Sequence, residues 1–377
     1  MRSLSLFSMS FVAAALAAVA WGCAAPSDAD ADADPDLDAE HQDDEGTSED
    51  ALSSLAIADY RALAPEARIT TSVIASKLGP RVEAGKTIFA IRSLSLQGER
   101  VRLVVDGTSF ETSLVAEAAL SASARVPTAA DRASDAPYAK SLAALAASGG
   151  SLDRVAPSAP NLGAEEPFAL TIDMCQSRKP WDRKLFEWAV TLSDQLRKPV
   201  PLGIAMTGLW AKAHPAELDE LLGWERSGKI AITWINHSST HPLHCQNASC
   251  SKALFLTAPS VDFDEEVLGE ERTVLARGMI PSVIFRFPGL VHDANRRRQL
   301  NRLSLLPIDA NGWIAKGQPI APRAVVLVHG NGNEPEGITG FLRQVSTPTR
   351  AAALRSGKSA VVPPTFIAPT PPTSSAR

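Results

Sequence analysis

The stretch Ile235-Asn236-His237-Ser238-Ser239-Thr240-His241-Pro242 directly follows an apolar run at residues 230–234. It places two imidazoles four residues apart, at the point where a predicted strand ends. Side chains at positions i and i+4 of a helical turn share one face, so both rings could converge on one ion. A His-x3-His pair alone is weak evidence for a metal site. The segments on either side of it decide the interpretation.

From about residue 166 onward, apolar runs typical of strands alternate with segments that have helical spacing. We predict strands at residues 168–172, 200–206, 229–235, 282–287, 305–308 and 324–328, and helices at 181–197, 215–226, 263–277 and 293–302. Such alternation predicts an α/β fold, with a parallel sheet or barrel covered by helices. In these architectures the chemistry gathers at the carboxyl ends of the strands.

Polar and aromatic side chains follow the predicted strands at just these ends. They form the segments Thr171-Ile172-Asp173, His237 to His241, Arg286-Phe287-Pro288-Gly289, Asp309 to Trp313 and Leu327-Val328-His329. Read in this order, they resemble the polysaccharide deacetylase family (NodB homology, carbohydrate esterase family four). The resemblance covers residues 166–345, about half of the chain. It implies a distorted (β/α) barrel and the removal of acetyl groups from chitin-like glycans, peptidoglycan or xylan.

The resemblance also implies a role for each matching side chain. His237 and His241 would hold a divalent metal, which we expect to be zinc, to polarise the carbonyl and activate water. Asp173 would be the general base. Arg286 would orient that carboxylate. His329 would be the general acid, and we expect Asp309 to hold its proton in place. Substrate contacts would come from Phe287 with its neighbouring backbone N–H groups, Pro288, Trp313 and Leu327, the last two lining a pocket for the acetyl methyl group.

One departure affects the metal site. The family's first motif has a second Asp that binds the metal, and Met174 stands in its place here. A thioether is a poor substitute for a carboxylate on a borderline ion. Three outcomes stay open: Cys175 or His244 supplies the third ligand, water completes a two-histidine site, or the metal is lost.

These alternatives define the functional hypotheses. The first is a metal-dependent hydrolase that deacetylates an envelope or extracellular polysaccharide. The second is a catalytically degenerate, deacetylase-like lipoprotein that binds glycan without turnover, and a third is a structural lipoprotein. The first is favoured because a pure binding protein needs no base and acid together.

The amino-terminal 50 residues predict export. Arg2 and an apolar stretch at residues 11–21, too short for a membrane span, resemble a signal peptide over residues 1–23. Small residues before Cys23 resemble a lipobox, so we expect a lipid anchor at Cys23; a secretory signal cut nearby is the alternative. Residues 24–50 read as an acidic, disordered tether, with 12 acidic and no Lys or Arg residues between Ser27 and Asp50. We therefore expect a monomer in the cell envelope, anchored to a membrane, with no nucleic-acid partner.

The remaining boundaries follow from composition. Residues 51–125 predict a small β-rich accessory domain, with a hairpin signal at Asp106-Gly107. Residues 126–165 predict a linker or a weak helix, residues 166–345 the catalytic domain, and residues 346–377 a partly disordered tail. An exported protein meets oxidising conditions, so we expect one disulfide, with Cys245–Cys250 and Cys175–Cys245 as the alternatives.

Overall fold

The computed structural model describes residues 55–63, 68–70, 73–123, 135–156, 164–247 and 252–368. The predicted signal peptide, Cys23 and the acidic tether lie outside these residues and stay predictions. Cys250 also lies outside them. No helix within the described residues is both long and apolar enough to cross a bilayer.

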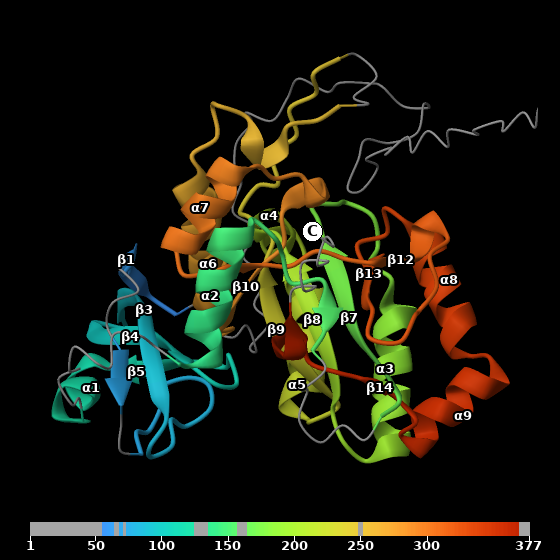
Figure 1. Ribbon diagram of the computed structural model, residues 1–377, viewed down its shortest axis with the longest axis horizontal. Coiled ribbons are helices and arrows are strands. Elements are labelled where there is room, and N and C mark those ends of the chain that lie inside the picture. Colours follow the sequence, from blue (N-terminus) through green and yellow to red (C-terminus); the bar gives the residue numbers. More distant parts are fainter. Residues whose placement is uncertain are drawn as a thin grey trace, which may run out of the picture.

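A parallel sheet forms the centre of the molecule (Figure 1). Its strands run in the order β11-β10-β9-β8-β7-β13-β12, and β14 pairs with the start of β7. Their bounds are β7 Glu166–Met174, β8 Val200–Met206, β9 Ile230–Asn236, β10 Pro281–Phe285, β11 Leu306–Pro307, β12 Gly312–Trp313, β13 Val325–His329 and β14 Ser359–Val361. Every neighbouring pair is parallel. The predicted α/β class, with its curled sheet and outer helices, is confirmed.

Helices lie on the outside of this sheet, as βα alternation requires. They are α3 Arg183–Leu196, α4 Gly208–Ala213, α5 Pro215–Arg226, α6 Phe263–Ala276, α7 Ala294–Arg302, α8 Pro335–Val345 and α9 Pro348–Ser356. The four predicted helices are all present. Ile172, Met174 and Val328 of the sheet pack with Phe186 of α3 and Phe341 of α8 in one buried cluster.

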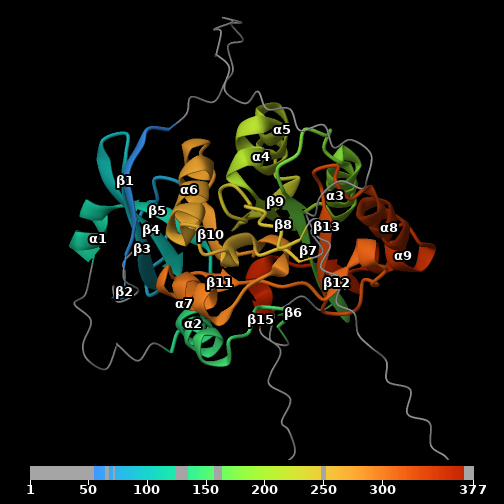
Figure 2. The same cartoon turned by 90° about the horizontal axis from the view of Figure 1, so that it is seen from above.

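The amino-terminal part forms a separate antiparallel sheet, which lies beside α6 and β10 (Figure 2). Its elements are β1 Ile57–Ala62, β2 Arg68–Thr70, β3 Thr87–Leu96, β4 Glu99–Asp106, β5 Thr112–Ala116 and the short helix α1 Glu117–Ser123. The predicted turn at Asp106-Gly107 is present, and the Asp106 carboxylate accepts hydrogen bonds from the backbone of Thr108 and Ser109. The β-rich prediction for this region is confirmed.

This small sheet is not an independently packed unit. Phe89 and Ile91 of β3 share one buried core with Val283 and Phe285 of β10. A buried ion pair adds to the contact: Arg92 Nε and Nη2 donate to the Glu271 carboxylate of α6 at 2.7 and 2.8 Å. The accessory sheet therefore holds α6 in place.

The two segments that flank the predicted catalytic domain both contain helices and strands. The expected linker contains α2 (Pro137–Ser148) and β6 (Arg154–Val155), and Leu152 pairs with Ile308 just beyond β11. The expected tail contains α9, β14 and β15 (Ile367–Ala368), and β15 pairs with β6. The first segment is rich in Ala and Ser and the second in Pro, a composition typical of segments without regular structure. Both nevertheless contain apolar residues that are buried against the sheet, such as Leu152, Val155 and Ile367.

Replacing Arg92 with Met should destabilise the protein strongly, because it leaves the Glu271 carboxylate buried without its cationic partner. Removing one member of a buried ion pair costs about 3–5 kcal/mol. Urea unfolding measures this loss. The exposed Arg100, paired with Glu117 at the surface, is the matched control, and Arg100→Met should shift the midpoint little. Equal shifts in the two variants would contradict a structural role for the buried pair.

Candidate active site

The alternation of side chains along β7 places the first site residues. Successive residues of a strand point to opposite faces of its sheet. Ile172 and Met174 point into the core beneath the helices, where Met174 is fully buried. Thr171 and Asp173 take the other face, and Cys175 continues this face beyond the end of β7. Met174 is therefore a core residue and not a ligand.

A tight turn after β9 positions the two histidines. The Ser238 N–H donates to Asn236 Oδ1, and the His241 N–H donates to Ser238 Oγ. Ser238 and His241 both have a positive φ, near 69° and 49°. The segment is thus a turn and not a helix.

Helix α6 fixes this turn from outside. The Ser239 N–H donates to the backbone carbonyl of Glu266, and the Thr240 N–H and hydroxyl donate to the Glu266 carboxylate. Asn236 Nδ2 donates to the Val267 carbonyl. The position of the histidines therefore depends on the position of α6.

Both imidazoles are buried and neutral. Burial lowers the pKa of His237 to about 3 and, together with the neighbouring His237, lowers the pKa of His241 to about 3. The ring centroids are 5.0 Å apart. Neutral imidazole is the form that binds metal.

The hydrogen bonds of the two rings indicate which nitrogen atoms could bind an ion. His237 Nδ1 lies 2.8 Å from the Arg286 carbonyl, which accepts its proton and leaves Nε2 as the atom with a lone pair. Neither ring nitrogen of His241 has a hydrogen-bond partner among the described residues. Buried polar atoms are nearly always paired, so an unpaired buried imidazole fits a ligand site.

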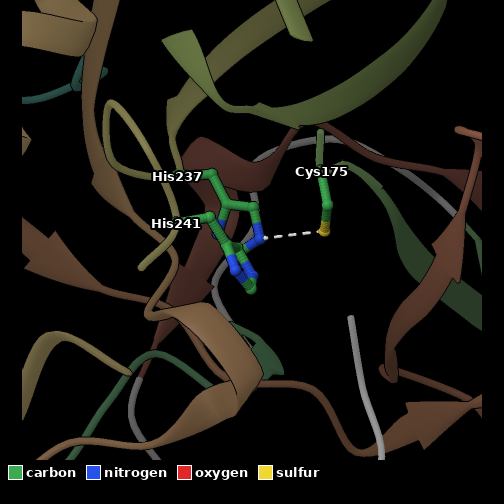
Figure 3. A group of neighbouring side chains, drawn as sticks. All are labelled: Cys175, His237 and His241. Carbon is green, nitrogen blue, oxygen red and sulfur yellow. Dashed lines mark hydrogen bonds between the residues drawn. The ribbon is translucent and has the colours of Figure 1, made fainter. Parts of the chain in front are cut away.

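Cys175 completes the group, and Figure 3 shows its side chain beside both rings. Its Sγ lies 3.6 Å from His237 Nε2, and the ligand atoms of Cys175, His237 and His241 all lie within 4.8 Å of one another. This trio could hold a metal ion. His244, the other expected substitute, does not belong to the group.

The oxidation state of Cys175 decides whether the third ligand exists. Cys175 and Cys245 are both disulfide-bonded, and the described residues include no free cysteine. Metal binding by cysteine requires the thiolate. The group therefore offers three ligands when Cys175 is reduced and two imidazoles when it is oxidised.

Asp173 lies between a cation and an imidazole. Its Oδ1 is 3.4 Å from Arg286 Nη1, and its Oδ2 is 3.7 Å from His237 Nε2. Arg286 Nη2 also donates to the Thr171 hydroxyl at 2.9 Å. Arg286 thus orients one oxygen of the carboxylate and leaves the other toward the histidines.

His329 ends β13 directly beside Asp173, its register partner on β7. Its Nδ1 lies 2.6 Å from Glu334 Oε2, and Trp313 Nε1 donates to the same carboxylate at 3.1 Å. The expected Asp309–His329 pair was wrong, because Asp309 faces His292 instead, with Nε2 3.7 Å from Oδ1. The sequence offered one signal for Glu334, which is its place five residues after His329 on the same loop.

The residues predicted to contact the substrate lie in two places, beside His329 and in the core next to Arg286. Trp313 is largely buried, with its ring centroid 5.8 Å from that of His329, so it lines the His329 side of the site. Leu327 is buried two residues before His329 on β13, so both side chains lie on the same face of that strand. Phe287 and Pro288 are buried, and Phe287 packs against Phe263 and Phe285. We assign Phe287 to core packing.

A cavity of about 440 Å³ lies elsewhere, beside the starts of β8, β9 and β10. It contains none of the residues that converge at the candidate active site. The cavity therefore gives no guide to the chemistry.

No family model matches the chain. Among solved structures, it is similar to a family 4 carbohydrate esterase from Bacillus anthracis (16% identity, 59% of this chain and 88% of that one, TM-score 0.38). It is also similar to PdaA, a family 4 carbohydrate esterase from Bacillus subtilis (15% identity, 58% and 85%, TM-score 0.38). A third is a CE4 family pseudoenzyme from Bacillus anthracis (14% identity, 53% and 64%, TM-score 0.34). These identities and scores are low, so the interpretation depends on the side chains described above.

The metal-free protein should lose stability as the pH falls. The pKa of both His237 and His241 is about 3 when folded and about 6.5 when unfolded. Between these values the unfolded chain binds more protons, so the free energy of unfolding rises with pH, by at most about 1.4 kcal/mol per pH unit for each group.

Urea unfolding of chelator-treated protein at pH 7, 5 and 4 tests this. His241→Gln should show a shallower pH dependence than the wild type, because one buried neutral imidazole is gone. The matched control His244→Gln should keep the wild-type dependence. An unchanged slope in His241→Gln would rule out the proposed linkage.

Proposed function

We propose that the protein is a metal-dependent hydrolase that removes acetyl groups from an envelope or extracellular polysaccharide, peptidoglycan or a chitin-like glycan. The observation that carries the proposal is the pair of buried, neutral imidazoles beside the Cys175 sulfur and the Asp173 carboxylate. Both ring nitrogens of His241 are buried without a hydrogen-bond partner among the described residues. A bound ion would supply a partner for one of them.

His237 and His241 would hold the ion through a ring nitrogen each, and the Cys175 thiolate would be the third ligand. These donors suit zinc, which prefers nitrogen and sulfur ligands. When bound, zinc would supply a Lewis acid for the acetyl carbonyl and lower the pKa of a water molecule. The Arg286 carbonyl accepts the Nδ1 proton of His237, so Nε2 is the ring nitrogen that would hold the ion.

Asp173 would be the general base. Arg286 engages its Oδ1, so Oδ2, on the side of His237, is the oxygen that takes the proton from the attacking water. A general base of this kind typically contributes ~10²–10⁴-fold to the rate.

His329 would be the general acid. Glu334 occupies its Nδ1, so Nε2 is the atom that can deliver a proton to the leaving amine or alcohol. Glu334 precedes the first turn of α8 and also accepts from Trp313, so two contacts fix its carboxylate. It takes over the role that we had expected of Asp309.

A specific observation favours the alternative, a glycan-binding protein without turnover. The position of the family's metal-binding Asp carries Met174, and Cys175 is disulfide-bonded. In this form only two imidazoles remain for an ion. We propose the hydrolase for the reduced protein, which we expect to be exported and anchored to a membrane through lipid at Cys23.

Metal analysis of the purified protein tests the ligand set. Protein reduced before loading should bind close to one equivalent of zinc, because Cys175 then supplies a thiolate. His241→Ala and Cys175→Ser should each lower the zinc affinity at least about 10-fold, and the matched control His244→Ala should bind like the wild type. Equal zinc binding by His241→Ala and the wild type would exclude this site.

Acetate release from acetylated chitooligosaccharide and peptidoglycan tests the activity. Asp173→Asn should lower kcat by ~10²–10⁴-fold while zinc binding persists, because it removes the base and keeps the shape. Asp264→Asn, at an exposed position on α6, is the control and should leave the rate unchanged. No acetate from zinc-loaded wild type on either substrate would reject the hydrolase in favour of the binding protein.

A further inference from the structure

Asn331 has a buried side chain that the proposed chemistry does not use, although it lies between two parts of the candidate site. It comes two residues after the end of β13 and is fully buried. Its Nδ2 donates to the backbone carbonyl of Cys175 at 2.9 Å. The Asn331 side chain therefore joins the segment after β7 to the loop after β13.

Cys175 depends on such a contact because it lies just beyond the sheet. Strand β7 ends with Met174, which pairs with Met206 of β8. On its other side, the last register pair joins Asp173 to His329 of β13. Beyond these pairs the inter-strand ladders no longer hold the chain. A buried carbonyl at such a place is paired by a side chain or by water, and here Asn331 supplies the donor.

The Asn331 amide is itself held in one orientation. Its Oδ1 accepts a hydrogen bond from the Asn333 N–H at 3.3 Å, which leaves Nδ2 to face the Cys175 carbonyl. An asparagine side chain that bonds to the backbone two residues further on is a common turn. An ionised aspartate could keep this turn, but it would offer the Cys175 carbonyl no donor.

Further contacts hold the two segments together. The Asp182 N–H donates to the Gly330 carbonyl at 2.9 Å. Gly332 has a φ of 75°, and a Cβ there would overlap the Pro180 carbonyl oxygen, so this close approach of the two backbones suits glycine. The loop after β13 is thus packed directly against residues 175–182.

The Cys175 sulfur is the group whose place depends on these contacts. Its Sγ and the ligand atoms of His237 and His241 lie within 4.8 Å of one another. Gln176 Nε2 donates to the His241 carbonyl at 3.4 Å, so the segment is also held to the histidine turn. A movement of the Cys175 backbone would carry the sulfur away from both rings, and metal affinity depends on how such ligands are oriented.

The loop after β13 also carries the partner of the expected general acid. Glu334 comes three residues after Asn331, and its Oε2 lies 2.6 Å from His329 Nδ1. The contact between Asn331 and Cys175 therefore fixes the metal side and the acid side of the site relative to each other.

We infer that Asn331 is a positioning residue, which holds the Cys175 carbonyl so that the sulfur stays beside the two imidazoles. Asn331 acts through Cys175 and contacts neither the ion nor the substrate. The inference rests on the proposed function, because it requires Cys175 to be a metal ligand in the reduced protein.

Cobalt(II) substitution of the reduced protein tests this inference, because a cobalt–thiolate bond gives a charge-transfer absorption in the near ultraviolet. The wild type should show this band, and Cys175→Ser should lack the part that is due to Cys175. Asn331→Ala should lose most of that part and should lower the zinc affinity about 10-fold, measured by competition with a chromogenic chelator. Asn331→Asp, which keeps the turn to Asn333, should show the same loss and is the second variant should Asn331→Ala not fold.

Asn301 provides the matched control, since its Nδ2 also donates to a backbone carbonyl at 2.9 Å, that of Leu142 in the contact between α7 and α2. Asn301→Ala should lower the urea midpoint and leave the cobalt spectrum and the zinc affinity unchanged. In the Cys175→Ser background, adding Asn331→Ala should have little further effect on zinc affinity, because the ligand that it positions is already gone.

Three results would overturn the inference: a wild-type cobalt spectrum and zinc affinity in both Asn331 variants, the same losses in Asn301→Ala, or no Cys175-dependent band in the wild type. Failure of the proposed function has a different signature. The expected spectra and affinities without any acetate release would support the role of Asn331 and reject the hydrolase. Acetate release by the wild type together with unchanged spectra in the Asn331 variants would do the reverse.

Discussion

The two-residue alternation of β7, at the centre of a parallel sheet, is the constraint on which the candidate site depends. It sends Thr171, Asp173 and Cys175 to one face and buries Met174 on the other. Because β13 pairs in register with β7, His329 lies directly beside Asp173. A shift of one residue in this register would exchange the two faces, so the Asp173 carboxylate would enter the core and the Met174 thioether would face the histidines.

Burial determines the electrostatics of the site. Two imidazoles without solvent stay neutral, while Asp173 keeps a cationic partner in Arg286. This combination favours binding of a cation over binding of protons, which is what a metal centre needs. The sulfur of Cys175 is the variable component, since its oxidation state separates a three-ligand site from a two-ligand one.

The accessory sheet and the candidate site are connected through one helix. Arg92 of β3 binds Glu271 of α6, and Glu266, five residues earlier on the same helix, holds the turn that carries His241. Tyr60 of β1 also donates to Glu271. The small sheet thus acts as a support that positions α6, and through it the turn that carries His237 and His241.

Local patterns in the sequence determined the α/β class, the helices α3, α5, α6 and α7, and most strands of the central sheet. They also determined the strand ends that carry Asp173, His237, His241, Arg286 and His329. These features follow from periodicity and from residues close in the chain. The tertiary structure alone decided which carboxylate meets His329, because Glu334 and Asp309 reach the site through loops whose paths no local pattern specifies. It likewise chose Cys175 over His244 and brought Asn331 to Cys175, since contacts between distant segments depend on how the whole sheet packs.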